Sequence, residues 1–336
     1  MSETQQLLLV GWAGALGLVV GSFLNVCIFR LPRDCMSVVK PRSRCPKCLR
    51  FIAWYDNLPV ASWIALGGRC RHCRVPISPR YPLVELLTGA LYAWAAWGAL
   101  VDPPRPLGEA GAIFLVEAGF IGALIVCAFI DLDLRILPDE VTKPGIAAGL
   151  AFAFAFPWFL PLFGELAEPL RLVHLATGGH DPLRDGTTAA AAFRRVARFE
   201  SEYPRLGSLA ASGLGAAVGF GVIWAVGMLG KILFRKRIAR LGETEAMGFG
   251  DVKYMAMMGA VLGWKGILLT LVVACFAGAV FGLVKLAVLR RMGFAPFGPF
   301  LSIGALSMLL GSSQVDAAIR LYLDGTHRFS RWLFSP

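Results

Sequence analysis

The chain has 336 residues, of which 57% are hydrophobic and only 16% are charged, and its formal net charge is +11. In soluble domains roughly a quarter of the residues are charged. This composition therefore excludes an ordinary soluble protein and favours one that lies largely in a bilayer. Loops that face anionic lipid head groups account for the positive charge, and no nucleic-acid partner is needed to explain it.

Long apolar runs recur along the chain and predict an all-α polytopic membrane protein. A helix needs about 20 apolar residues to cross a bilayer core. About eight runs approach that length, at 7–29, 83–101, 112–130, 145–163, 208–230, 252–263, 266–289 and 297–311. The run at 252–263 is short, so seven or nine spans are the alternatives.

The distribution of Lys and Arg predicts the orientation of these spans. The segments 30–82, 131–144, 231–255 and 285–296 together hold most of the basic residues. The positive-inside rule places these segments in the cytoplasm, which leaves both termini extracytoplasmic. We therefore divide the chain into a first span (1–29), a cytoplasmic domain (30–82), a transmembrane core (83–311) and a tail (312–336).

The cytoplasmic domain at 30–82 carries two Cys-x2-Cys pairs: Cys45 and Cys48, and Cys70 and Cys73. Four thiolates in two such pairs suit a tetrahedral structural zinc ion, which would stabilise a segment too small to bury much core. Two disulfides are the alternative, which a reducing cytoplasm disfavours. We expect a small zinc-ribbon-like domain between the first two spans, with His72 as a bystander.

Two aspartates stand where a long apolar run meets a polar stretch: Asp131, and Asp251 at the end of the Gly-Phe-Gly-Asp sequence 248–251. Two predicted spans separate them, so both carboxylates return to the same face of the membrane. An ionisable group in such a place is costly and is a functional candidate. Two at matched depth favour a pair that shares a proton and performs acid–base chemistry.

Six short motifs carry a resemblance to a known family. They lie at 21–32, 54–59, 80–85, 130–139, 247–253 and 296–299 and read GSFLNVCIFRLP, WYDNLP, RYPLVE, IDLDLRILPD, MGFGDVK and PFGP. With the cysteine pairs, their order and spacing resemble the type IV prepilin peptidases, or leader peptidase/N-methyltransferases, which are GxGD-type aspartic proteases. The resemblance implies a bacterial inner-membrane enzyme whose active site faces the cytoplasm.

The resemblance also implies that Asp131 and Asp251 are the proteolytic pair. One carboxylate would take a proton from the attacking water while the other, protonated, polarises the scissile carbonyl; the sequence does not say which starts charged. Gly248 and Gly250 would let the backbone approach the substrate closely.

Each aspartate has an alternative interpretation. Asp133 and Asp139 compete with Asp131 for the first catalytic position, and Asp131 could instead cap a helix end or pair with Arg135. Asp251 could be no more than a negative charge favoured at a helix N-terminus, a role compatible with catalysis.

Members of this family cleave prepilins and pseudopilins, and many then methylate the new N-terminus with S-adenosylmethionine. The four cysteines favour a member with both activities, and a peptidase-only member is the alternative. Glu85, Asn25 and Arg30 are the candidates for methyl transfer, which we expect at the cytoplasmic domain. Their alternatives are structural: a partner for Arg80 or a lysine in the case of Glu85, and helix-end contacts for the other two.

Residues 165–208 depart from the family pattern as an extracytoplasmic insertion, with a short amphipathic helix near its end. It is a candidate docking segment for the pilus or secretion machinery. His174, His180 and Asp181 within it are interpreted as solvated residues rather than metal ligands. The tail at 312–336 predicts an amphipathic helix at the extracytoplasmic membrane surface.

Two other classes of function compete with the enzyme. A transporter would commonly show a repeated half and charges near the midplane of the bilayer, and neither is visible in this sequence. A non-catalytic zinc-ribbon membrane scaffold would tolerate replacement of both aspartates, which separates it from a peptidase by experiment.

Overall fold

The computed structural model describes residues 2–33, 37–40, 42–101, 105–157, 188–233, 248–289 and 296–311. Within these ranges the regular structure is helical apart from two isolated β-bridges, which confirms the all-α prediction. The elements in chain order are α1 (Glu3–Arg30), the 3-10 turn η1 (Trp54–Asn57), α2 (Ala61–Ala65), α3 (Arg80–Leu100), α4 (Leu107–Leu134), α5 (Asp139–Ala155), α8 (Thr188–Glu202), α9 (Pro204–Leu233), α11 (Phe249–Leu289) and a last helix, Gly298–Gly311.

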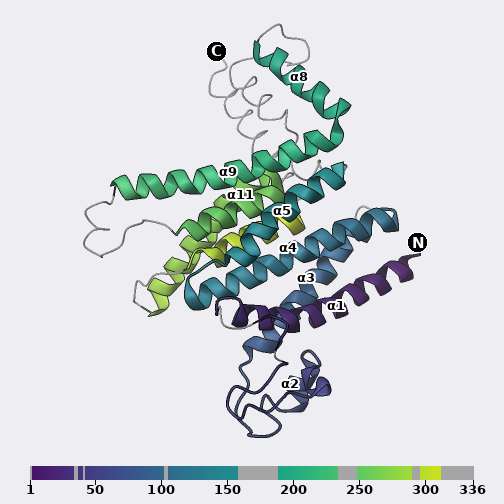
Figure 1. The fold of residues 1–336 in the computed structure, drawn as a ribbon, viewed down its shortest axis with the longest axis vertical. Helices are drawn as coiled ribbons and strands as arrows, with labels where there is room; N and C mark the ends of the chain where they lie inside the picture. Colours follow the sequence, from purple (N-terminus) through teal and green to yellow (C-terminus); the bar gives the residue numbers. More distant parts are fainter. Residues whose placement is uncertain are drawn as a thin grey trace, which may run out of the picture.

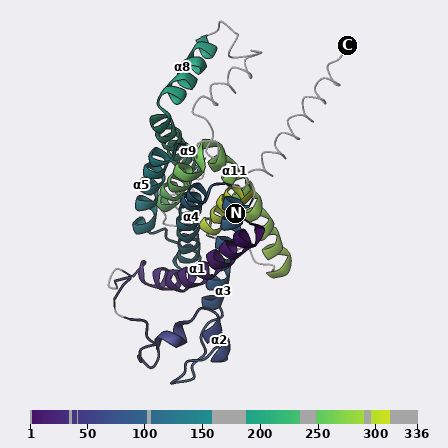
Figure 2. The same cartoon turned by 90° about the vertical axis from the view of Figure 1, so that its right-hand side faces the viewer.

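The long helices lie side by side in one bundle (Figure 1). The polar segment between α1 and α3 extends from one side of this bundle, and α8 extends from the other side (Figures 1 and 2). The predicted amphipathic helix of the insertion is therefore present as α8. Residues 165–187 of the predicted insertion and the tail at 312–336 lie outside the described residues.

Five of the described helices are long and apolar enough to cross a membrane: α1, α3, α4, α9 and α11. The chain is therefore a multi-pass membrane protein. The remaining predicted runs are also helical where they are described, but they do not form separate helices of spanning length: α5 has 17 residues, the last helix is shorter, and the run at 252–263 is part of α11. The count of eight spans stays a prediction.

α11 is interrupted at Gly263, where φ is 69° and ψ is 178°. This conformation is essentially restricted to glycine. Backbone atoms of Met255 and the side chain of Ile267 both lie against Gly219 of α9. Residues that far apart would be separated by about 18 Å in a straight helix. The chain therefore bends back sharply at Gly263, at the place where the sequence separates the runs 252–263 and 266–289.

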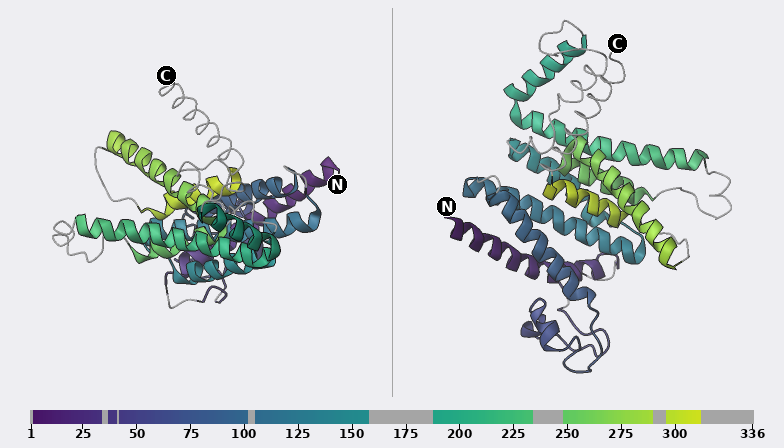
Figure 3. Two further views of the ribbon diagram at one scale, coloured as in Figure 1. Left: turned by 90° about the horizontal axis from the view of Figure 1, so that it is seen from above. Right: turned by 180° about the vertical axis from the view of Figure 1, so that it is seen from behind.

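α4 is the central helix of the bundle. In its most apolar stretch 61% of the residues are buried, compared with 17% in α1. It contributes to two apolar cores, one shared with α1 and α3 and the other with α9, α11 and the last helix. Representative members are Leu24, Val84, Tyr92, Ile121 and Ile125 in the first core, and Leu124, Cys127, Ile223, Met258 and Leu301 in the second. Viewed from above and from behind, α4 again lies among the other helices (Figure 3).

The contact between α9 and α11 depends on a missing side chain. A Cβ at Gly215 would collide with the carbonyl oxygen of Gly259, whereas a Cβ at Gly213 on the same helix would meet nothing within 4 Å. We therefore expect Gly215→Val to lower the free energy of unfolding by about 1–3 kcal/mol. Thermal unfolding of the full chain in detergent measures this, with Gly213→Val as the matched control. Equal melting temperatures for the two variants would contradict the packing.

Candidate functional site

The four cysteines of the polar domain form one cluster. Their sulfur atoms all lie within 4.8 Å of one another, and Cys45 Sγ is 3.7 Å from Cys73 Sγ. All four are free thiols, so the alternative of two disulfides is not what the structure shows. Four sulfur donors converging on one point suit a thiophilic ion in tetrahedral coordination. His72 lies outside the cluster, with Nδ1 3.3 Å from Arg50.

Both cysteine pairs are held by the same backbone turn. The residue after the second cysteine adopts a left-handed conformation in each case, with φ of 58° at Leu49 and 55° at Arg74. The N–H of Leu49 donates to the carbonyl of Cys45 at 2.9 Å, and that of Arg74 donates to Cys70 at 3.0 Å. The left-handed backbone conformation costs a non-glycine residue about 1–3 kcal/mol. The turn nevertheless occurs at both cysteine pairs, where it directs the thiols toward one point.

The thiols differ in their readiness to ionise. The backbone N–H of Cys48 is the main cause that lowers the pKa of Cys45 to about 6. A hydrogen bond from Val75 lowers the pKa of Cys73, but desolvation and the three neighbouring thiols outweigh it and raise that pKa to about 11. The cluster therefore does not carry four thiolates by itself, and a bound cation would supply the charge that allows all four to ionise.

Asp131 lies in the last turn of α4, which Arg135 closes in a left-handed conformation. Only 6% of the residue is exposed. Its Oδ2 accepts a hydrogen bond of 2.9 Å from the N–H of Gly298, the first residue of the last helix. The first N–H groups of a helix have no partner inside that helix. The Asp131 carboxylate thus satisfies a helix start that would otherwise be unpaired in the bundle.

Asp251 lies in the first turn of α11 and is partly buried. Its N–H donates to the carbonyl of Gly248 at 3.1 Å. Gly250, the residue before Asp251, packs against Leu137, and Lys253 pairs with Asp139, so the first turns of α11 lie against the connection that follows Asp131. The two aspartates are therefore close in space although 120 positions separate them in the chain. Both aspartates thus lie at the same end of the bundle, and their action as a pair stays a prediction.

The two rival aspartates are engaged elsewhere. Asp133 is 44% exposed in its side chain, and both of its oxygens accept hydrogen bonds of 2.7 Å from Arg80. Asp139 pairs with Lys143 at 2.7 Å and also with Lys253, and the hydrogen bonds from these two lysines hold the pKa of Asp139 below its ordinary value. Neither rival is buried as Asp131 is.

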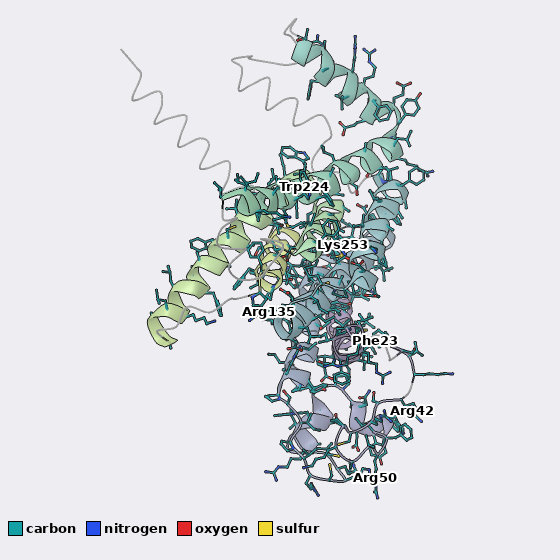
Figure 4. All side chains as sticks on the ribbon, turned by 60° about the vertical axis from the view of Figure 1, so that its left-hand side comes forward. Phe23, Arg42, Arg50, Arg135, Trp224 and Lys253 are labelled. Atoms are coloured by element: carbon teal, nitrogen blue, oxygen red, sulfur yellow. The ribbon has the colours of Figure 1, made fainter. Side chains whose placement is uncertain are left out.

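Arg135 forms no ion pair with Asp131 in the part of the chain that the structure describes. The alternative in which the two residues form a direct ion pair is therefore not what the structure shows. Figure 4 labels Arg135 and Lys253 on the helical bundle. The pair between Lys253 and Asp139 joins the first turn of α11 to the first turn of α5, so it also stabilises the end of the bundle where the aspartates meet.

The two glycines of the Gly-Phe-Gly-Asp sequence have different surroundings. Gly248 is exposed, and among the described residues a Cβ there would meet only the Asp251 carboxylate, at 3.8 Å. A Cβ at Gly250 would come within 3.2 Å of Leu137 Cβ, in the connection between α4 and α5. Gly248 thus leaves open space beside Asp251, whereas Gly250 allows α11 to pack closely against that connection.

The three candidates for methyl transfer lie where the cysteine domain meets α1 and α3, and each binds backbone. Glu85 Oε2 accepts from the N–H of Val60 at 2.7 Å, and Asn25 Nδ2 donates to the carbonyl of Tyr81 at 3.1 Å. The guanidinium of Arg30 donates to backbone carbonyls at 37 and 38. Arg80 pairs with Asp133, so the alternative in which it pairs with Glu85 is wrong.

Gly298 is the residue of this site that sequence reasoning did not single out. A Cβ there would lie 2.6 Å from Asp131 Oδ2, so glycine is required for the close approach. The motif at 296–299 indicated that the segment mattered. The contact itself links positions 167 residues apart and has no local signal in the sequence.

Two models of known protein families match parts of this chain. A family model described as "Bacterial Peptidase A24 N-terminal domain" matches residues 15–99, and one described as "Type IV leader peptidase family" matches residues 188–283. The first match includes the four cysteines, and the second includes Asp251 but not Asp131. No solved structure matches the chain.

Three curated relatives carry the name prepilin leader peptidase/N-methyltransferase. The protein of Myxococcus xanthus is 39% identical over 83% of this chain, a match that spans 63% of that longer relative. The protein of Burkholderia pseudomallei is 34% identical over 89% of this chain and 84% of the relative. That of Pseudomonas aeruginosa is 30% identical, over 92% and 91%.

Proposed function

The chain belongs to the type IV prepilin leader peptidase/N-methyltransferase family, and we propose that it removes the leader of type IV prepilins or type II secretion pseudopilins with Asp131 and Asp251. The observation that supports this assignment is that the start of α11, which carries Asp251, packs against the connection that follows Asp131 at the end of α4. Because the relative from Myxococcus is longer than the matched region, the substrates and partners of the relatives enter here only as proposals.

Cleavage needs one ionised and one protonated carboxylate. The ionised member takes a proton from a water molecule whose oxygen attacks the scissile carbonyl carbon, and the protonated member donates its proton to the carbonyl oxygen. Collapse of this intermediate breaks the C–N bond, and the amine leaves with a proton returned by the pair. Asp131 is fixed by the Gly298 N–H on Oδ2, so its orientation is set before substrate arrives.

We place this site at the cytoplasmic face of the bacterial inner membrane, with both termini extracytoplasmic. The cysteine domain, which carries Arg42 and Arg50 (Figure 4), lies between the end of α1 and the start of α3. The ion pair between Arg80, at the start of α3, and Asp133, near the end of α4, supports a common end of the bundle for this domain and Asp131. Basic residues concentrate on the cytoplasmic side of membrane proteins.

We propose that a zinc ion held by Cys45, Cys48, Cys70 and Cys73 stabilises the cysteine domain and that this domain serves methyl transfer. Zinc would supply charge and cross-linking to a domain with little apolar core. S-adenosylmethionine would be the methyl donor. Glu85, Asn25 and Arg30 lie at the junction of the domain with α1 and α3, where they would shape the pocket for the new amine.

The insertion at 165–208 is proposed as a docking segment for the pilus or secretion machinery. Its described part, α8, projects away from the cysteine domain, so a partner bound there would not obstruct the aspartates (Figure 1). His174, His180 and Asp181 lie outside the described residues.

Replacement of either aspartate tests the peptidase assignment. We expect Asp131→Asn and Asp251→Asn each to lower cleavage of a prepilin peptide by about 10²–10⁴-fold, since each removes one half of the acid–base pair. Glu140→Gln is the matched control, because Glu140 is exposed and lies in the first turn of α5 near Asp131 in sequence. Cleavage by either asparagine variant at the rate of the control would refute the pair.

Metal analysis tests the cysteine site. We expect purified protein to hold about one zinc per chain, as a four-sulfur structural site requires, and Cys48→Ser to lose most of it. Elemental mass spectrometry of detergent-purified protein measures the content. Cys275→Ser is the control, since Cys275 is an exposed thiol of α11 outside the cluster. Equal zinc in the two variants would rule out the site.

Two substitutions of Glu85 separate a chemical role from an anchoring role. Glu85→Gln keeps an acceptor for the Val60 N–H but loses the base, whereas Glu85→Leu loses both. We expect Glu85→Gln to lower the methylated fraction at least about tenfold while cleavage stays within about twofold. Mass spectrometry of a co-expressed prepilin reports both activities. Methylation kept by the glutamine variant and lost by the leucine variant would leave only the anchoring role. Unmethylated product from the wild type would identify a peptidase-only enzyme.

A further inference from the structure

Tyr254 is a fully buried residue of α11 whose hydroxyl has a defined partner. It lies one turn after Asp251, on the same helix, so the two side chains project to neighbouring positions. Its hydroxyl is 2.7 Å from Ser302 Oγ, and Ser302 is itself only 4% exposed. A buried hydroxyl without a partner costs about 1–3 kcal/mol, so each of these residues depends on the other.

Each of the two hydroxyl groups has one proton to donate, and this fixes the direction of the hydrogen bond between Tyr254 and Ser302. Ser302 Oγ donates to the carbonyl of Gly298 at 2.9 Å, which uses its single proton. Ser302 Oγ must then accept the proton of the Tyr254 hydroxyl. The carbonyl of Leu124 lies at 3.5 Å from both hydroxyls, at the limit of a hydrogen bond, and is the weaker acceptor.

This chain of hydrogen bonds ends on the residue that contacts Asp131. Gly298 accepts from Ser302 through its carbonyl and donates to Asp131 Oδ2 through its N–H. The Ser302 hydroxyl and the Asp131 carboxylate therefore bind the two sides of the same helix start. Tyr254 thus connects the helix that carries Asp251 to the donor that orients Asp131.

We infer that Tyr254 and Ser302 are positioning residues of the peptidase site, which hold the Gly298 N–H against Asp131 and fix the last helix relative to the first turn of α11. The inference rests on the proposed peptidase function. Neither side chain is assigned a contact with substrate, and both act through Gly298. Displacement of a catalytic group by about 1 Å is enough to lower turnover about a hundredfold. Loss of the Tyr254 or Ser302 hydroxyl, which would let Gly298 shift against Asp131, is therefore expected to lower kcat.

The test is steady-state cleavage of a prepilin peptide by the full chain in detergent. We expect Tyr254→Phe and Ser302→Ala each to lower kcat about tenfold or more, with KM within about twofold. Because both belong to one chain of hydrogen bonds, the double variant should lose about as much as the worse single variant rather than the product of the two losses. If Tyr254→Phe fails to fold, Ser302→Ala alone still decides the outcome through the same split between kcat and KM.

Tyr92→Phe is the matched control. It also removes a buried tyrosine hydroxyl, which donates to the carbonyl of Ala118 at 2.9 Å, but in the core between α3 and α4. We expect it to change melting temperature as Tyr254→Phe does while kcat stays at the wild-type value. The inference is overturned if Tyr254→Phe has the kcat of Tyr92→Phe, if the losses of Tyr254→Phe and Ser302→Ala multiply, or if the loss is in KM.

Two further controls separate this inference from the proposed function. Wild-type protein must cleave the peptide and Asp131→Asn must not. If the wild type is inactive or Asp131→Asn is active, the peptidase assignment itself fails. If both controls behave as expected and Tyr254→Phe turns over like the wild type, the aspartate pair stands and only the role of Tyr254 and Ser302 is lost.

Discussion

The hydrogen bond from the Gly298 N–H to Asp131 is the contact on which the site depends. It joins the end of α4 to the start of the last helix, and it satisfies an orphan donor and a buried carboxylate at once. Asp251 stands at another helix start, in the first turn of α11. Asp251 therefore lies at the positive end of its own helix, whereas Asp131 lies in the last turn of α4 and reaches the positive end of the last helix through Gly298. An apolar bundle can accommodate two acids in this way without surrounding them by cations.

The cationic side chains near the site form ion pairs with Asp133 and Asp139. Arg80 holds Asp133, and Lys143 and Lys253 hold Asp139, all at the edge of the bundle where the ion pairs remain partly solvated. This division leaves Asp131 without a direct ion pair among the described residues. It also ties α3, α4, α5 and α11 together around the site. The cysteine domain joins the same network, because α3 begins at Arg80 and Glu85 binds the Val60 backbone.

Much of this arrangement could be predicted from the sequence because it follows from local patterns. Apolar length predicts the long helices, and Cys-x2-Cys spacing predicts the cluster of four thiols. The contacts of Gly298, Tyr254 and Ser302 could not be predicted, since they join segments far apart in the chain and involve backbone groups and common residue types. The bend of α11 at Gly263 lies between the predicted runs 252–263 and 266–289, and the count of eight spans stays a prediction.

The pH dependence of kcat/KM for prepilin cleavage tests whether Asp131 and Asp251 act together, because it reports the ionisation of two coupled carboxylates. A pair that needs one ionised and one protonated member gives a bell-shaped profile with two limbs. We predict a bell-shaped profile for the full chain in a bilayer or in detergent. A profile with a single limb would show that one group suffices and would contradict the shared role of Asp131 and Asp251.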